Sequence, residues 1–84
     1  MSKEKILRRV LSGASDTNIR FDDLCHLLGS FGFEMRVRAS HHVFRKAGVE
    51  EKINLQREGS DAKPYQVRQV RAVLVKYRLG GEES

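Results

Sequence analysis

Two segments near the start of the chain carry apolar residues at the spacing of an α-helix. The segment 3–11 has one apolar stripe, made of Ile6, Leu7, Val10 and Leu11. The segment 21–31 has a wider stripe, made of Phe21, Leu24, Cys25, Leu27, Leu28 and Phe31. Because residues three and four apart share one face of a helix, we predict a helix over each segment. The polar stretch 12–18 between them is typical of a loop.

After Gly32 the apolar period changes to two. Two kinds of residue alternate, apolar Phe33, Met35 and Val37 and charged Glu34, Arg36 and Arg38. This pattern predicts a half-buried strand with its arginines on the wet side. Further strands are expected over 41–46 and 52–56, with connections at 39–40 and 47–51. The segment 65–79 returns to helical spacing, and Pro64 suits the start of a helix.

The order of these elements predicts an α+β fold. Two helices, a three-stranded antiparallel sheet and a last helix follow one another, and we expect the helices to cover one face of the sheet only. A chain of 84 residues has room for one small core. We expect a helical extension over 1–17, a folded unit over 18–79 and a flexible tail over 80–84.

Positive charge is concentrated in the second half of the chain. Sixteen Lys and Arg against eleven Asp and Glu give a net charge of +5, and the segment 33–78 alone holds eleven basic and five acidic residues. Such an excess indicates a polyanionic partner, most simply nucleic acid. An ordinary solvated surface is the alternative interpretation.

Several classes of protein lack their signatures here. No apolar run approaches the roughly 18 residues of a membrane span, and no apolar stretch follows the charged start as in a signal peptide. A single cysteine, Cys25, cannot form an internal disulfide, so we expect a cytoplasmic protein that contacts no membrane. The motifs CxxC, HExxH and GxxxxGK[ST] are absent.

The two adjacent histidines are expected to point to opposite faces of the second strand. Neighbouring strand residues alternate between faces, so His42 shares the inward side with Phe44, and His41 faces water. On that side we also expect Arg36, Arg38 and Arg45. This assignment leaves Val43 exposed, which is its weak point.

An exposed histidine among arginines can serve RNA cleavage. Histidine exchanges protons near neutral pH, and arginines bind phosphate. RNA supplies its own nucleophile, the 2′-hydroxyl, so no metal or other cofactor is required. An isolated surface histidine without a role is the competing interpretation.

Two further groups of residues are candidates for binding. The last helix carries Arg68, Arg71 and Arg78 on one side, which either contact phosphate or form a solvated face. A zinc site would need Cys25, His26, His41 and His42. Their directions diverge around the helix and across the sheet, so we expect no metal site.

Residues 18–79 resemble the HicA toxin family. The resemblance lies in Gly32-Phe33 at the end of a helix, in Arg38-Ala39-Ser40-His41-His42-Val43-Phe44, and in Lys63-Pro64-Tyr65-Gln66-Val67-Arg68-Gln69-Val70. The hallmark of the family is Gly-Ser-His-(His)-x-Phe on the second strand. Here Ala39 stands where the family has glycine, and the first 17 residues extend beyond the compact members.

The resemblance implies a fold, an activity and a partner. HicA proteins are ribosome-independent mRNA interferases with a double-stranded-RNA-binding-domain-like fold, and a HicB antitoxin covers their active face. Their catalytic histidine follows the motif serine, which is the position of His41. Ser40 would then orient the turn or bind phosphate.

Three hypotheses follow for this chain. The first is a metal-independent endoribonuclease toxin that acts on mRNA and is neutralised by a HicB-like antitoxin. The second is a module of the same fold that binds RNA or a protein partner without cleaving. The third is an oligomerisation domain that uses the apolar stripe of the first helix, although a monomer is the expectation for the chain.

Overall fold

The computed structural model describes residues 3–13 and 16–79. Three helices and one sheet follow in the order predicted, so the α+β class is confirmed. The elements are α1 (Lys3–Ser12), α2 (Phe21–Ser30), β1 (Glu34–Arg38), β2 (His41–Lys46), β3 (Val49–Gln56) and α3 (Pro64–Lys76). The tail expected over 80–84 lies outside the described residues.

The sheet is an antiparallel meander in the order β1-β2-β3. β3 begins at Val49, three residues before the predicted start, so the expected connection over 47–51 was too long. The turn needs only Ala47 and Gly48, because Gly48 adopts a φ of 88° that reverses the chain tightly.

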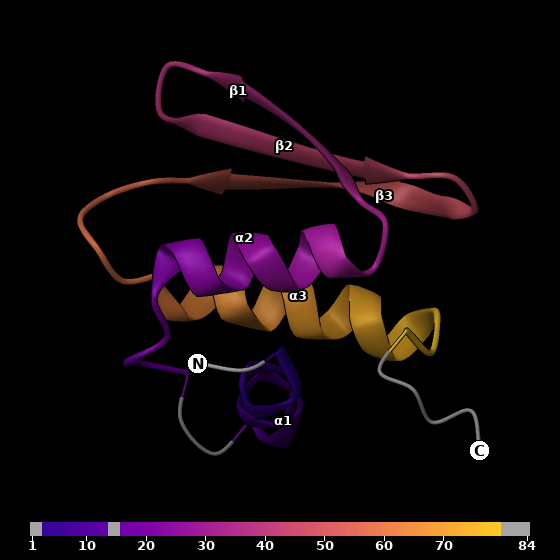
Figure 1. The fold of residues 1–84 in the computed structure, drawn as a ribbon, viewed down its shortest axis with the longest axis horizontal. Coiled ribbons are helices and arrows are strands. Elements are labelled where there is room, and N and C mark those ends of the chain that lie inside the picture. Colours follow the sequence, from indigo (N-terminus) through magenta and orange to yellow (C-terminus); the bar gives the residue numbers. More distant parts are fainter. Residues whose placement is uncertain (1–2, 14–15, 80–84) are drawn as a thin grey trace.

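The molecule has three layers. The sheet forms one layer, α2 and α3 lie side by side beneath it, and α1 packs on the far side of these two helices (Figure 1). The sheet contributes its helix-facing residues to the core between the first two layers. These buried residues are His42, Phe44, Ile53 and Leu55.

The first helix belongs to the same core. Ile6 and Val10 are buried, and Leu7 and Leu11 pack partly buried against the core cluster. The apolar stripe of α1 is therefore used within the monomer, which removes the observation that favoured an oligomerisation domain.

β1 departs from the prediction. We expected a half-buried strand, but all five residues from Glu34 to Arg38 are exposed. Met35 and Val37 share the helix-facing side with Phe44 and His42, yet no helix covers them. The residues buried by the helices on this side come from β2 and β3, so β1 overhangs the core.

Candidate nucleic-acid interface

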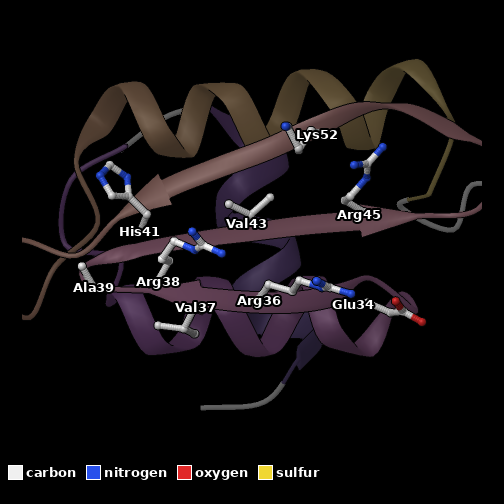
Figure 2. Close-up of a pocket in the computed structure, with 9 residues that line it drawn as sticks. All are labelled: Glu34, Arg36, Val37, Arg38, Ala39, His41, Val43, Arg45 and Lys52. Atoms are coloured by element: carbon white, nitrogen blue, oxygen red, sulfur yellow. The ribbon is translucent and has the colours of Figure 1, made fainter.

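The sheet face away from the helices contains an open hollow. Its lining includes four of the residues predicted from the sequence, His41, Arg36, Arg38 and Arg45 (Figure 2). The remaining lining residues are Glu34, Val37, Ala39, Val43 and Lys52. Sequence reasoning missed Lys52, although its alternation with buried Ile53 and Leu55 placed it on this face.

Strand pairing sets the neighbours of His41. Arg38 lies directly opposite His41 on β1, and Gln56 lies directly opposite it on β3. In the next row along the strands, Val43 separates Arg36 from Asn54. Because opposite residues in an antiparallel pair have Cβ atoms roughly 5 Å apart, the His41 imidazole stands within reach of a phosphate held by Arg38.

The cations of this hollow differ from five cations elsewhere in the molecule that form ion pairs. Elsewhere, ion pairs join Arg57 to Asp22, Lys63 to Glu58, Arg71 to Asp16 and Lys76 to Glu51. Within residues 3–13 and 16–79, none of the four cations of the hollow, Arg36, Arg38, Arg45 and Lys52, forms an ion pair. Among the described residues, Glu34 is the one carboxylate that lines the hollow, and it lies opposite Arg45 in the strand register. Four cations against one carboxylate leave the hollow with a net positive charge, which attracts an anionic ligand.

The second histidine points the other way, as predicted. His42 is only 9% exposed, and its ring packs edge-on against Phe21 with ring centroids 5.0 Å apart. Its Nδ1 lies 3.2 Å from the carbonyl oxygen of Ser40. His42 therefore packs in the core, contacts the turn and does not line the hollow.

Ser40 is used by the turn between β1 and β2. Its carbonyl oxygen accepts a hydrogen bond from the backbone N–H of Arg57 at 3.0 Å. Its hydroxyl oxygen accepts one from the Gln56 side-chain amide at 3.4 Å. Of the two roles expected for Ser40, these contacts fit orientation of the turn, and Ser40 does not line the hollow.

Ala39 adopts the backbone conformation that favours glycine. Its φ is 57°, in the left-handed region where a Cβ atom is strained. The two-residue connection between β1 and β2 requires this conformation and keeps Arg38 opposite His41. The alanine therefore preserves the geometry of the turn, with a backbone that glycine would relax.

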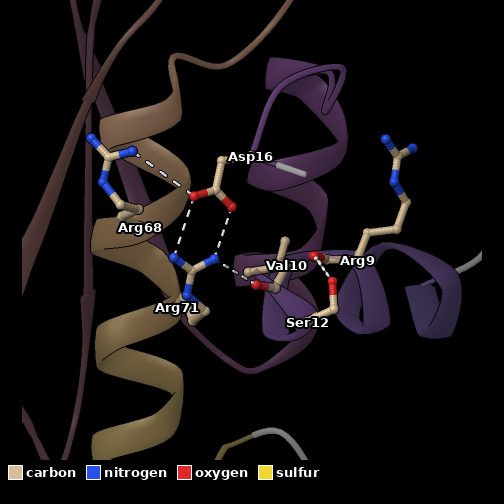
Figure 3. A network of polar contacts seen from close by, with 6 residues as sticks. All are labelled: Arg9, Val10, Ser12, Asp16, Arg68 and Arg71. Carbon is tan, nitrogen blue, oxygen red and sulfur yellow. Dashed lines mark hydrogen bonds and ion pairs between the residues drawn. The ribbon is translucent and has the colours of Figure 1, made fainter. Parts of the chain in front are cut away.

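The arginines of α3 lie away from the hollow. Arg71 donates hydrogen bonds to both carboxylate oxygens of Asp16, at 2.8 and 3.3 Å, and to the carbonyl oxygen of Val10 at 3.1 Å (Figure 3). Arg68 stands 3.9 Å from the same carboxylate. Arg71, which was expected to contact RNA, instead fastens α1 to α3, and its hydrogen bonds lower the pKa of Asp16.

The residues that a zinc site would need, Cys25, His26, His41 and His42, do not cluster. In the described part of the chain, no three His, Cys, Asp or Glu side chains come together as metal ligands. Cys25 lies half-buried against the core, and burial raises the pKa of its thiol to about 11. Such a thiol stays protonated at neutral pH and is a poor nucleophile.

The chain matches no protein-family model, no curated protein and no solved structure. Among the described helices, none is both long enough and apolar enough to cross a membrane. What the chain does must therefore be inferred from the geometry of the sheet face.

Proposed function

We propose that this protein is an endoribonuclease toxin of the HicA type, which cleaves mRNA by histidine acid/base chemistry without a metal. The observation that supports the proposal best is the position of His41. It is exposed at the start of the middle strand, on a sheet face with four cations and one carboxylate, and it occupies the place of the catalytic histidine in the resemblance.

The reaction uses a nucleophile that RNA provides. The neutral His41 imidazole takes the proton of a 2′-hydroxyl, and the 2′-oxygen attacks the adjacent phosphorus. The bond from phosphorus to the 5′-oxygen breaks, and the leaving oxygen takes a proton from water. The products are a 2′,3′-cyclic phosphate and a free 5′-hydroxyl.

The cations of the hollow hold the phosphate and stabilise its transition state. Arg38 faces His41 directly, and Arg36 lies one row further along the same strand. Their guanidinium groups donate paired hydrogen bonds to the phosphate oxygens, on which negative charge develops during attack. The half-buried Val43, opposite Arg36 and between His41 and Arg45 on β2, provides an apolar surface for the ribose.

The biological setting follows from this activity. A protein that cleaves mRNA acts in the cytoplasm, and its own cell requires a means to block it. We assign that role to a HicB-like antitoxin, which covers the hollow and keeps RNA from His41.

Growth arrest tests the proposal. Two variants are compared, each of which replaces one exposed histidine by alanine, inside or outside the hollow. Expressed without a partner, the wild-type protein arrests bacterial growth, and His41→Ala relieves the arrest. The matched control is His26→Ala, an exposed histidine of α2 outside the hollow, which remains toxic. Cells that grow normally while the purified wild-type protein binds RNA intact would assign the chain to the non-cleaving binding module. Full toxicity of His41→Ala would overturn the role of His41.

A further inference from the structure

β1 is an edge strand that pairs with β2 on one side only, and no described helix packs over it. One of its edges is unpaired within the part of the chain that the structure describes. On its helix-facing side, Met35 and Val37 are 49% and 54% exposed. Alternate residues of an edge strand direct their N–H and C=O groups outward, where they can pair with another strand.

The two faces of this edge differ in chemistry. By register, Met35 and Val37 share the helix-facing side with Phe44 and His42, and Val37 also lines the hollow. Arg36 and Arg38 lie on the other side with one carboxylate, Glu34. Lys52 and Arg45 add further positive charge behind these arginines (Figure 2). A strand that matches this edge has apolar residues on one side and carboxylates on the other.

A second copy of this chain matches the edge poorly. In a fully overlapped antiparallel pair of β1 strands, Met35 of each copy would face Val37, which is favourable. The same pairing places Glu34 opposite Arg38 twice, which is favourable, but it also places Arg36 opposite Arg36. It joins two faces that each carry four cations to one carboxylate. Like charges directly opposite each other destabilise a strand pair, so the charge pattern favours a different, acidic partner.

We propose that β1 accepts an extended segment of a protein partner as a fourth strand, in which apolar residues alternate with Asp or Glu. The apolar side chains of this segment cover Met35 and Val37, and its carboxylates pair with Arg36 and Arg38. Because these arginines also line the hollow, the bound strand excludes RNA from it. This last consequence rests on the proposed function, whereas the strand addition does not.

A designed peptide tests the strand addition directly. The probe is a labelled Val-Glu-Val-Glu-Val-Glu-Val peptide, and the control groups the same residues as Val-Val-Val-Val-Glu-Glu-Glu. We expect the alternating peptide to bind about tenfold tighter by fluorescence anisotropy. We also expect it to slow hydrogen exchange of alternate β1 amides. Equal binding of both peptides, or unprotected β1 amides, overturns the proposal.

Protein variants locate the binding surface. Met35→Thr and Val37→Thr remove apolar contact at exposed positions, so both variants fold and bind the alternating peptide several-fold more weakly. Val75→Thr is the matched control, because Val75 is 60% exposed on α3, outside the sheet. Unchanged affinity in both β1 variants, or a wild-type dimer that β1 substitutions dissociate, contradicts an acidic partner strand.

RNA binding is measured separately, so that the two proposals fail independently. Displacement of RNA by the alternating peptide supports both. If the protein binds the peptide with protection of β1 but neither binds nor cleaves RNA, the strand addition stands and the RNA function is overturned. If the protein cleaves RNA but does not bind the peptide, the RNA function stands and the strand addition is overturned.

Discussion

Arg38 and His41 stand directly opposite each other on β1 and β2, on the sheet face that the helices leave open. The turn that joins them consists of Ala39 and Ser40 only. The geometry of this turn therefore sets the distance between His41, the proposed proton acceptor, and Arg38, the arginine proposed to bind the phosphate.

The two histidines should differ in their effect on stability. His41 is exposed, so His41→Ala should lower the free energy of unfolding by only about 0.5 kcal/mol. His42→Ala removes a buried ring from Phe21 and a polar contact to Ser40, and should lower it by about 2 kcal/mol. Thermal unfolding of both variants checks this, and a larger loss for His41→Ala would refute the assignment of faces.

Salt dependence should reveal which arginines contact RNA. Replacing Arg36, Arg38 or Arg45 by Gln should each reduce the slope of log affinity against log salt by about 0.7, one phosphate of a single strand. Arg68→Gln removes the same charge from α3 and should leave the slope unchanged. If only Arg68→Gln flattened the slope, the RNA would lie along α3 instead.

The strained turn predicts opposite effects of glycine in the two hairpins. Ala39→Gly relieves a left-handed alanine but frees the unfolded chain, so the net gain should be at most about 1 kcal/mol. Ala39→Val should destabilise the fold by about 1–2 kcal/mol, because a branched side chain tolerates a positive φ poorly.

Ala47→Gly is the matched control for the turn. Ala47 lies in the β2–β3 turn and is not among the residues of positive φ, so glycine there should destabilise the protein. Denaturant unfolding measures all three variants. Destabilisation by Ala39→Gly as large as that by Ala47→Gly would show that the Ala39 backbone carries no strain.

Contacts at the end of α3 should make the stability of the fold depend on pH. Lys76 donates to one carboxylate oxygen of Glu51 and the Tyr77 hydroxyl to the other, both at 2.6 Å. These bonds lower the pKa of Glu51 from an ordinary 4.5 to about 2. Because the pKa is lower in the folded state, the ionised carboxylate stabilises the fold above pH 4.5. This stabilisation is lost as the pH falls toward 2.

Glu51→Gln isolates this contribution. The variant should be less stable than the wild type at neutral pH, and the difference should shrink as the pH falls from 4.5 to 2. Urea unfolding at several pH values measures it. A difference that stays constant over this range would show that the Glu51 carboxylate is not held by Lys76 and Tyr77.

The elements and the direction of the histidines were predictable because they follow from local periodicity. Alternation along β2 is enough to separate His41 from His42. The exposure of β1 was not predictable, because it depends on how far α2 and α3 extend beneath the sheet. Likewise, nothing in the spacing of Arg71 shows that Asp16, 55 residues earlier, engages it.

The chemistry of a single cut RNA bond tests the central claim most directly. Single-stranded RNA is incubated with the wild-type protein in excess chelator, the cleavage position is mapped, and the new ends are analysed. We expect cleavage with a 2′,3′-cyclic phosphate or 3′-phosphate end, none with His41→Ala, and none when the nucleotide before the cut is 2′-deoxy. A requirement for magnesium, a 5′-phosphate end, or cleavage of the 2′-deoxy substrate would contradict attack by a 2′-oxygen that His41 deprotonates.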